Sequence, residues 1–187
     1  NKRLRKKSEM VIVTREVTPE GYWSVVQSVS SQIYSDDLPN ILGVFKSKRE
    51  VKDVLAEMAG THGLCDRLLG LQICKGACFG HVLERCRGAC VKKEPREKYN
   101  LRFTEAFAKR KIKPWPYKGR ILIRENNYET EKARVHLADK WCYLGEVEEG
   151  WEDDDEKRSP YKFDLDAYKI LRGYLANKHN WKYVTEI

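Results

Sequence analysis

The sequence predicts an α+β protein with an N-terminal β-hairpin plus helix, a central cysteine-rich helical region and a small C-terminal α/β unit. Three observations support this prediction. Two β-branched runs flank a turn, helical periodicity follows a capping sequence at residue 47, and five of the six cysteines fall within residues 65–90. The 187 residues are 41% hydrophobic and 34% charged, a composition that can bury a core.

The N-terminal region is expected to open with a hairpin. Residues 10–17 and 22–30 are strand-like runs, and the Thr-Pro-Glu-Gly sequence between them is typical of a turn. Ser47 and Glu50 then form a capping box, in which the serine hydroxyl accepts from the backbone N–H three residues on. Apolar residues at i, i+3, i+4 and i+7 predict a helix over residues 48–59.

A second helix is expected over residues 95–110. Pro95 suits the first turn of a helix. Its apolar stripe comprises Tyr99, Phe103, Ala106 and Phe107. The proline-rich segment 113–118 then extends the chain and marks the expected domain break.

Strands and one helix are expected after this break. Residues 120–124, 134–144 and 181–185 predict strands, and Asp164 can cap a third helix. The apolar stripe of that helix comprises Ala167, Ile170, Leu171, Tyr174 and Leu175. The expected organisation is a hairpin–helix connecting region at 10–64, a cysteine-rich cluster and helix at 65–112, and a small α+β domain at 113–187 with an acidic loop at 146–156.

Charge is unevenly distributed along the chain, which has 36 Lys and Arg against 28 Asp and Glu. Eight of the acids lie within residues 146–156, so the rest of the chain carries a net charge of +16. Basic clusters suit a polyphosphate partner because each neutralised phosphate releases counterions, although such residues also cover ordinary soluble surfaces. The residues expected to contact DNA are Lys2, Arg3, Arg5, Lys6, Lys7, Lys92, Lys93, Arg96, Lys109, Arg110, Lys111 and Lys113.

Targeting signals are not recognisable in the sequence. No apolar run approaches the ~18 residues that a membrane span needs, and residues 1–8 are too polar for a signal peptide. We therefore expect a cytoplasmic protein without a membrane partner. Because the chain begins at Asn1 and in mid-pattern, we expect it to be the C-terminal piece of a longer protein.

The cysteines are the most informative feature. Five follow the spacing C-x8-C-x3-C-x7-C-x3-C, namely Cys65, Cys74, Cys78, Cys86 and Cys90. The cytosol would keep them reduced, and thiolates select zinc, copper(I) or iron–sulfur clusters. On a helix, Cys86 and Cys90 would share a face and could clamp one centre. Because the Cys-x2-Cys knuckles typical of zinc are absent, an iron–sulfur cluster is favoured, with zinc and inert buried thiols left open.

The same residues carry a family resemblance. The segment from Cys78 to Cys90, with Cys65 twelve intervening residues earlier, resembles the cysteine-rich region of UvrC excinucleases and their shorter Cho relatives. Further segments that resemble this family are residues 1–5, similar to the end of a GIY-YIG nuclease domain, and residues 43–50, 114–116, 141–145 and 163–171.

The resemblance implies a nucleotide-excision-repair endonuclease that incises DNA beside a lesion. On this basis residues 1–9 end an upstream nuclease domain, with Asn1 as the end of its motif. Cys65, Cys78, Cys86 and Cys90 would hold a 4Fe–4S cluster, with zinc as the alternative. The resemblance also implies a divalent metal in the upstream domain, damaged duplex DNA as substrate and a damage-recognition helicase subunit as partner.

Departures from the family pattern leave alternatives open. Cys74 is an additional cysteine and a possible substitute ligand, while Ala89 and His81 stand where the family usually has proline and an aromatic residue. The GIY-YIG tyrosines, arginine and glutamate are not recognisable, so catalysis is expected to lie outside this chain. The alternatives are a stand-alone zinc-stabilised interaction module, the tail of a DnaQ-type 3′–5′ exonuclease fusion, and an enzyme using Cys142. The last is disfavoured because a thiol buried among aromatic residues is inert.

Overall fold

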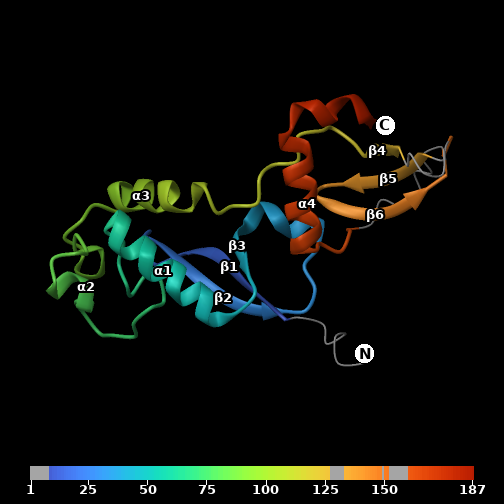
Figure 1. The fold of residues 1–187 in the computed structure, drawn as a ribbon. Coiled ribbons are helices and arrows are strands. Elements are labelled where there is room, and N and C mark those ends of the chain that lie inside the picture. The colour runs from blue at the N-terminus through green and yellow to red at the C-terminus, as the bar shows by residue number, and fades with distance from the viewer. Residues whose placement is uncertain (1–8, 127–132, 149, 152–159) are drawn as a thin grey trace. The chain divides into compact units, whose positions relative to one another are not determined.

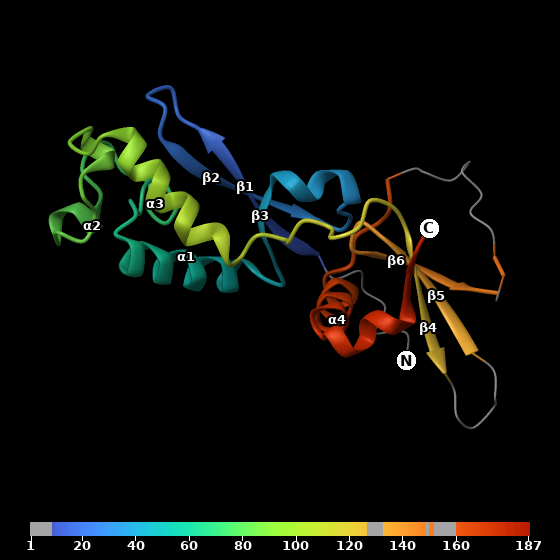
Figure 2. The same cartoon turned by 90° about the horizontal axis from the view of Figure 1, so that it is seen from above.

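The computed structural model describes residues 9–126, 133–148, 150–151 and 160–187, drawn in colour in Figures 1 and 2. They form two compact units. The first comprises residues 9–31 and Asn40–Ile112, and the second comprises Gln32–Pro39 and the described residues between Lys113 and Ile187. Each unit combines helices with a small antiparallel sheet, so the α+β prediction is confirmed. Every helix among the described residues is too short or too polar to cross a lipid bilayer.

The first unit contains a three-stranded sheet. The predicted hairpin is present as β1 (Met10–Val17) and β2 (Trp23–Ser30), with Val17 paired to Trp23. A third strand that the sequence reasoning missed, β3 (Ile41–Phe45), pairs with the other edge of β1. Only one face of β1 enters the core, through Val11 and Val13.

Two helices cover that face, and they pack against each other (Figure 2). The predicted helix at 48–59 is α1 (Lys48–His62), which continues to a left-handed Gly63. Ser47 Oγ accepts from Glu50 N–H at 3.1 Å, as the capping box predicts, while the Glu50 carboxylate accepts from Lys46 N–H at 2.8 Å.

The second helix, α3 (Arg96–Ala108), begins directly after Pro95. Its predicted apolar stripe is buried as expected and comprises Tyr99, Phe103, Ala106 and Phe107. The three aromatic residues of this stripe form a continuous column, with ring centroids 6.3 Å apart for Tyr99 and Phe103 and 4.6 Å apart for Phe103 and Phe107.

The cysteine-rich segment between these helices is built mostly from turns. It contains only a short helix, α2 (Phe79–Val82), and a 3₁₀ turn, η3 (Ala89–Val91). Cys86 lies in a bend and Cys90 lies in η3, so the two do not share a helix face, contrary to the expectation from their spacing. The segment is tied to the sheet edge by the Val25 N–H, which donates to Leu68 O at 3.0 Å.

The second unit has a four-stranded antiparallel sheet in the order β6-β5-β4-β7. The strands are β4 (Ile121–Asn126), β5 (Ala133–Asp139), β6 (Cys142–Val147) and β7 (Val184–Glu186). The prediction of one strand over 134–144 is wrong, because Lys140 and Trp141 form a tight turn with φ of 47° and 65°. The expected terminal strand is also shorter, since η5 (Lys178–Tyr183) occupies its first half.

Helix α4 (Leu165–Ala176) completes the second unit and begins as predicted, with Asp164 Oδ1 accepting from Ala167 N–H at 2.7 Å. Leu171 and Leu175 are buried, but Ile170 is 73% exposed and does not belong to the buried stripe. A short 3₁₀ helix, η2 (Ser35–Asn40), precedes β3 in the chain. Its Ser35 N–H donates to Tyr161 O at 2.8 Å, which places this early segment in the second unit.

Candidate metal centre

Four cysteine sulfurs gather at one point in the first unit. The Sγ atoms of Cys65, Cys78, Cys86 and Cys90 all lie within 4.8 Å of one another, and all four side chains are buried. Cys78 Sγ is 3.7 Å from Cys65 Sγ and 3.6 Å from Cys90 Sγ. Cys74 lies outside this group and is only half-buried. The four cysteines therefore could bind a metal, and they are the four that the family resemblance singles out.

The local chain geometry explains how residues 25 positions apart converge. Gly63 ends α1 in a left-handed conformation and turns the chain into Cys65. Asp66 then accepts from Gly80 N–H at 3.0 Å, which holds the start of α2 beside it. A Cβ atom at Gly80 would lie 2.7 Å from Asp66 Oδ2, so any larger residue there would displace the Asp66 carboxylate.

Backbone amides and neighbouring thiols shape the electrostatics of the site. Cys78 N–H points to Cys90 Sγ and Gly88 N–H to Cys86 Sγ, both at 3.4 Å. The hydrogen bond with Cys65 is the main cause that lowers the pKa of Cys86 to about 5, and the Gly88 amide contributes. The same thiol–thiol hydrogen bond and burial raise the pKa of Cys65. The thiolate is the form of cysteine that binds metals.

The sulfur spacing restricts what the site can hold without rearrangement. A tetrahedral zinc ion with Zn–S bonds of ~2.3 Å places its sulfurs about 3.8 Å apart. The distances of 3.7 and 3.6 Å that join Cys78 to its two neighbours match this value. A 4Fe–4S cluster binds each thiolate to a different iron, so its sulfurs must lie farther apart. Two of the sulfur–sulfur distances therefore match those around one tetrahedral ion, and all four sulfurs lie within 4.8 Å of one another.

A buried ion pair connects the segments before and after the cysteine site, and sequence reasoning missed it. Arg102 Nη2 lies 2.5 Å from both carboxylate oxygens of Glu94, and Arg102 Nη1 donates to Gly63 O at 2.7 Å. Tyr22 OH donates to Glu94 O at 2.5 Å. The sequence did carry a signal for this ion pair. Arg102 lies three positions after Tyr99, so this charged residue falls on the apolar side of the predicted helix.

The basic residues expected to contact DNA are distributed more widely. Those outside the described residues, together with Asn1, are Lys2, Arg3, Arg5, Lys6 and Lys7. Three others are paired with acids, namely Lys92 with Glu20 at 3.3 Å, Arg96 with Glu97 at 2.8 Å and Arg110 with Glu57 at 3.4 Å. Lys93, Lys109 and Lys111 are exposed on the first unit, and Lys113 is exposed on the second. Of the expected acidic loop, residues 149 and 152–156 lie outside the described residues.

The thiol of Cys142 is not one of the four gathered sulfurs. It belongs to the second unit, where burial raises its pKa to about 12. A protonated thiol is a poor nucleophile. This supports the preference against an enzyme that uses Cys142.

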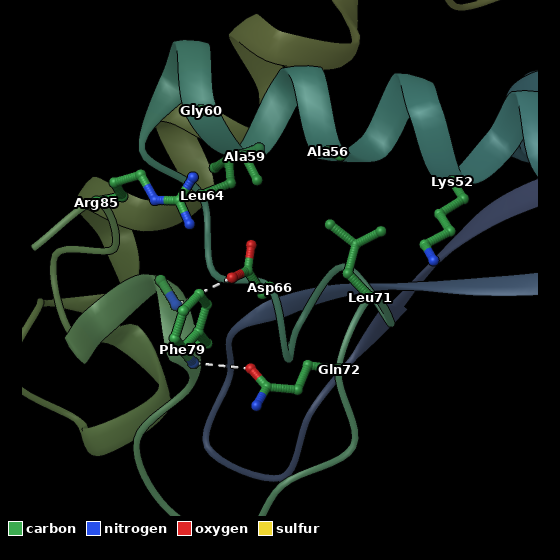
Figure 3. A pocket seen from close by; sticks show the side chains of 11 residues that line it. Lys52, Ala56, Ala59, Gly60, Leu64, Asp66, Leu71, Gln72, Phe79 and Arg85 are labelled. Atoms are coloured by element: carbon green, nitrogen blue, oxygen red, sulfur yellow. Dashed lines mark hydrogen bonds between the residues drawn. The ribbon is translucent and has the colours of Figure 1, made fainter. Parts of the chain in front are cut away.

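A groove of about 440 Å³ runs beside the cysteine site (Figure 3). Helix α1 borders it through Ala56 and Gly60, and Phe79 of α2 borders it on the other side. Sequence reasoning missed this groove, because its walls come from segments about 20 residues apart that only the fold brings together.

A small α+β chain with four buried thiols gathered at one point is a cysteine-rich protein that could bind a metal. Comparison with known families identifies it further. Residues 13–109 match the model of the UvrC/Cho excinuclease middle domain, and residues 120–185 match the excinuclease Cho C-terminal domain. The first match covers more than half of the chain, and this chain belongs to the UvrC/Cho excinuclease family.

Curated relatives agree with this assignment. The excinuclease Cho proteins of Shigella flexneri and Escherichia coli strain K12 are each 36% identical over 135 residues, and that of Salmonella typhi is 35% identical. These alignments cover 71% of this chain and 45% of each relative, so the chain spans less than half the length of the curated relatives it matches. No solved structure matches it.

Proposed function

We propose that this chain is the C-terminal portion of a nucleotide-excision-repair endonuclease of the UvrC/Cho type. In this proposal its four cysteines bind a metal centre, and its basic surface positions damaged duplex DNA for an upstream nuclease domain. The observation that carries the proposal is the buried four-sulfur site within the region that matches the excinuclease middle domain. A divalent metal in the upstream domain and a damage-recognition helicase subunit as partner belong to the same proposal.

The first occupant we propose for the centre is a 4Fe–4S cluster. The resemblance to UvrC-type proteins supports it, as does the absence of Cys-x2-Cys knuckles. The second is a zinc ion, which the sulfur spacing of 3.6 and 3.7 Å supports directly. Either occupant would fix α2, η3 and the turn after α1 at one point, since the cysteines come from all three.

DNA would be bound through its backbone. Contacts from lysine and arginine to phosphates position a duplex without reading its sequence, which suits cutting beside lesions in any sequence. Of the bases expected to contact DNA, Lys93, Lys109 and Lys111 are exposed in the first unit. Lys92, Arg96 and Arg110 would first have to exchange their carboxylate partners for phosphates.

Two measurements test the proposal. Anaerobic purification followed by metal analysis and visible absorption should give either a coloured protein with four irons per chain or a colourless protein with one zinc. A chain that retains neither metal would overturn the metal centre. Affinity for duplex DNA should fall steeply with salt concentration. The double substitution Lys109→Ala and Lys111→Ala should reduce the slope of log affinity against log salt concentration by about one unit per lysine. Absent or salt-independent binding would instead favour the stand-alone interaction module.

A further inference from the structure

The groove beside the cysteine site has a wall of small residues. Ala56, Ala59 and Gly60 of α1 form this wall, and Leu71 and Phe79 face it (Figure 3). A Cβ atom added to Gly60 would meet nothing within 4 Å, so the space above this glycine is open. With a volume of about 440 Å³, the groove is large enough for a nucleotide-sized ligand.

Two cations extend into the groove from opposite sides. Lys52 projects from α1 at one end, and the guanidinium of Arg85 faces it from the other (Figure 3). Within the described part of the chain, neither side chain forms a hydrogen bond or an ion pair. The carboxylate in the groove, Asp66, already accepts from Gly80 N–H at 3.0 Å. Lys52 belongs to the first turns of α1, whereas the Arg85 backbone lies beside Gly63 at the end of that helix, so the groove offers a cation for an anionic group at each end.

An aromatic ring lines the same groove, on the side of Arg85 (Figure 3). Phe79 is 56% exposed although it begins α2, and its backbone N–H is fixed by Gln72 Oε1 at 2.7 Å. Large aromatic side chains normally bury their rings, so a ring held open on a rigid backbone is available for stacking. A phosphate-sized anion site beside a free aromatic face is the combination that single-stranded nucleic acids use.

We propose that this groove binds one nucleotide of an unpaired DNA strand, with its phosphate at Arg85 and its base against Phe79. The inference rests on the proposed function and adds a site specific for unpaired DNA. A peptide is the competing occupant, because Ile73 and Val82 are also exposed nearby. The two unpaired cations directed into the groove favour a nucleotide over an apolar peptide segment.

The test uses a matched pair of glycines. Gly60 and Gly173 both lie inside helices, and a Cβ at either would meet nothing within 4 Å. Gly60→Leu should fill the groove and weaken binding of a fluorescein-labelled oligothymidine strand about tenfold, measured by fluorescence anisotropy. Phe79→Ala should weaken it by a similar factor, whereas Gly173→Leu should leave it unchanged. Circular dichroism confirms that each variant is folded.

Duplex DNA serves as the second probe. Affinity for a blunt duplex should stay within about twofold of the unsubstituted chain in all three variants, because a paired base cannot enter the groove. Unchanged strand affinity in Gly60→Leu and Phe79→Ala would overturn the inference, and so would an equal loss for strand and duplex. Efficient competition by thymidine monophosphate would identify a free-nucleotide site and overturn it as well. If the unsubstituted chain bound neither form, the proposed function itself would fail.

A protein occupant gives a different result. Groove variants would then bind the strand normally but lose incision in the full-length protein assayed with its helicase partner. That outcome would overturn the nucleotide inference while leaving the DNA-repair proposal intact.

Discussion

Arg102 and Glu94 form a buried two-oxygen ion pair, in which Arg102 Nη2 lies 2.5 Å from each carboxylate oxygen of Glu94. The two side chains are only 13% and 5% exposed. The guanidinium also donates to Gly63 O, so one side chain joins the end of α1 to the chain that leaves the cysteine site.

Arg102→Met should therefore destabilise the first unit strongly. The substitution leaves a buried carboxylate without its partner, which typically costs about 3–5 kcal/mol. Urea unfolding followed by fluorescence measures the change. Arg110→Met is the matched control on the same chain, since its pair with Glu57 is exposed and should contribute only ~0–1 kcal/mol. Equal, small losses in both variants would contradict a structural role for the buried pair.

The cysteines should differ sharply in metal retention. Cys86→Ser removes one of the four gathered sulfurs and is expected to abolish stoichiometric metal, whereas Cys74→Ser should retain it. Mass spectrometry of metal content after purification distinguishes the two. Chelation should also lower the free energy of unfolding, because binding energy at such sites is folding energy. Retained metal in Cys86→Ser with loss in Cys74→Ser would show that the ligand set is different.

Alkylation should discriminate between the exposed and buried thiols. Because the pKa of Cys142 is raised to about 12, only ~10⁻⁴ of it is thiolate near pH 8. Its thiolate fraction grows about tenfold for each pH unit below that pKa, so its reaction with iodoacetamide should accelerate about a hundredfold between about pH 7 and 9. Cys74 should react first in the metal-loaded protein, as peptide mass mapping would show. Rapid modification of Cys142 at neutral pH would restore the nucleophile hypothesis.

Gly88 should be required for the centre. Its φ is 92°, and a Cβ there would lie 2.9 Å from the Cβ of Lys93. Gly88→Ala therefore combines a left-handed backbone with a clash, and we expect a loss of about 2 kcal/mol or more with weaker metal binding. Gly76→Ala separates the two effects, since Gly76 also has positive φ but open space around it. It should cost about 1–2 kcal/mol and retain the metal. Denaturant titration with metal analysis compares them.

Local signals predicted the helices well. Ser47 and Glu50 lie three residues apart and act through their own backbone neighbours, so α1 could be located without knowledge of the fold. Asp164 predicted the start of α4 for the same reason. Helix periodicity also predicted the buried stripe of α3, because Tyr99 and its companions fall on one side of any regular helix.

Features that depend on tertiary contacts were not predictable in this way. The turn at Lys140 and Trp141 lacks the Asn-Gly pair that usually permits two positive φ values. Long-range contacts hold it instead, since Trp141 Nε1 donates to Lys113 O at 2.6 Å and its ring packs on Tyr168. The cysteine spacing likewise indicated a metal site, but spacing alone could not separate Cys74 from the four gathered sulfurs.

Residues 32–39 give the chain an unusual connectivity. They belong to the second unit, although residues on both sides of them in sequence belong to the first. The polypeptide therefore passes between the units three times. A single proteolytic nick within 113–118 would leave residues 32–39 attached to the first unit, and only noncovalent contacts would hold the C-terminal fragment to them. A chain truncated after residue 112 would expose Ile33 and Leu38, which are 1% and 7% exposed in the intact fold. A single recombination crossover could not exchange the whole second unit between relatives, because residues 32–39 of that unit are encoded before α1.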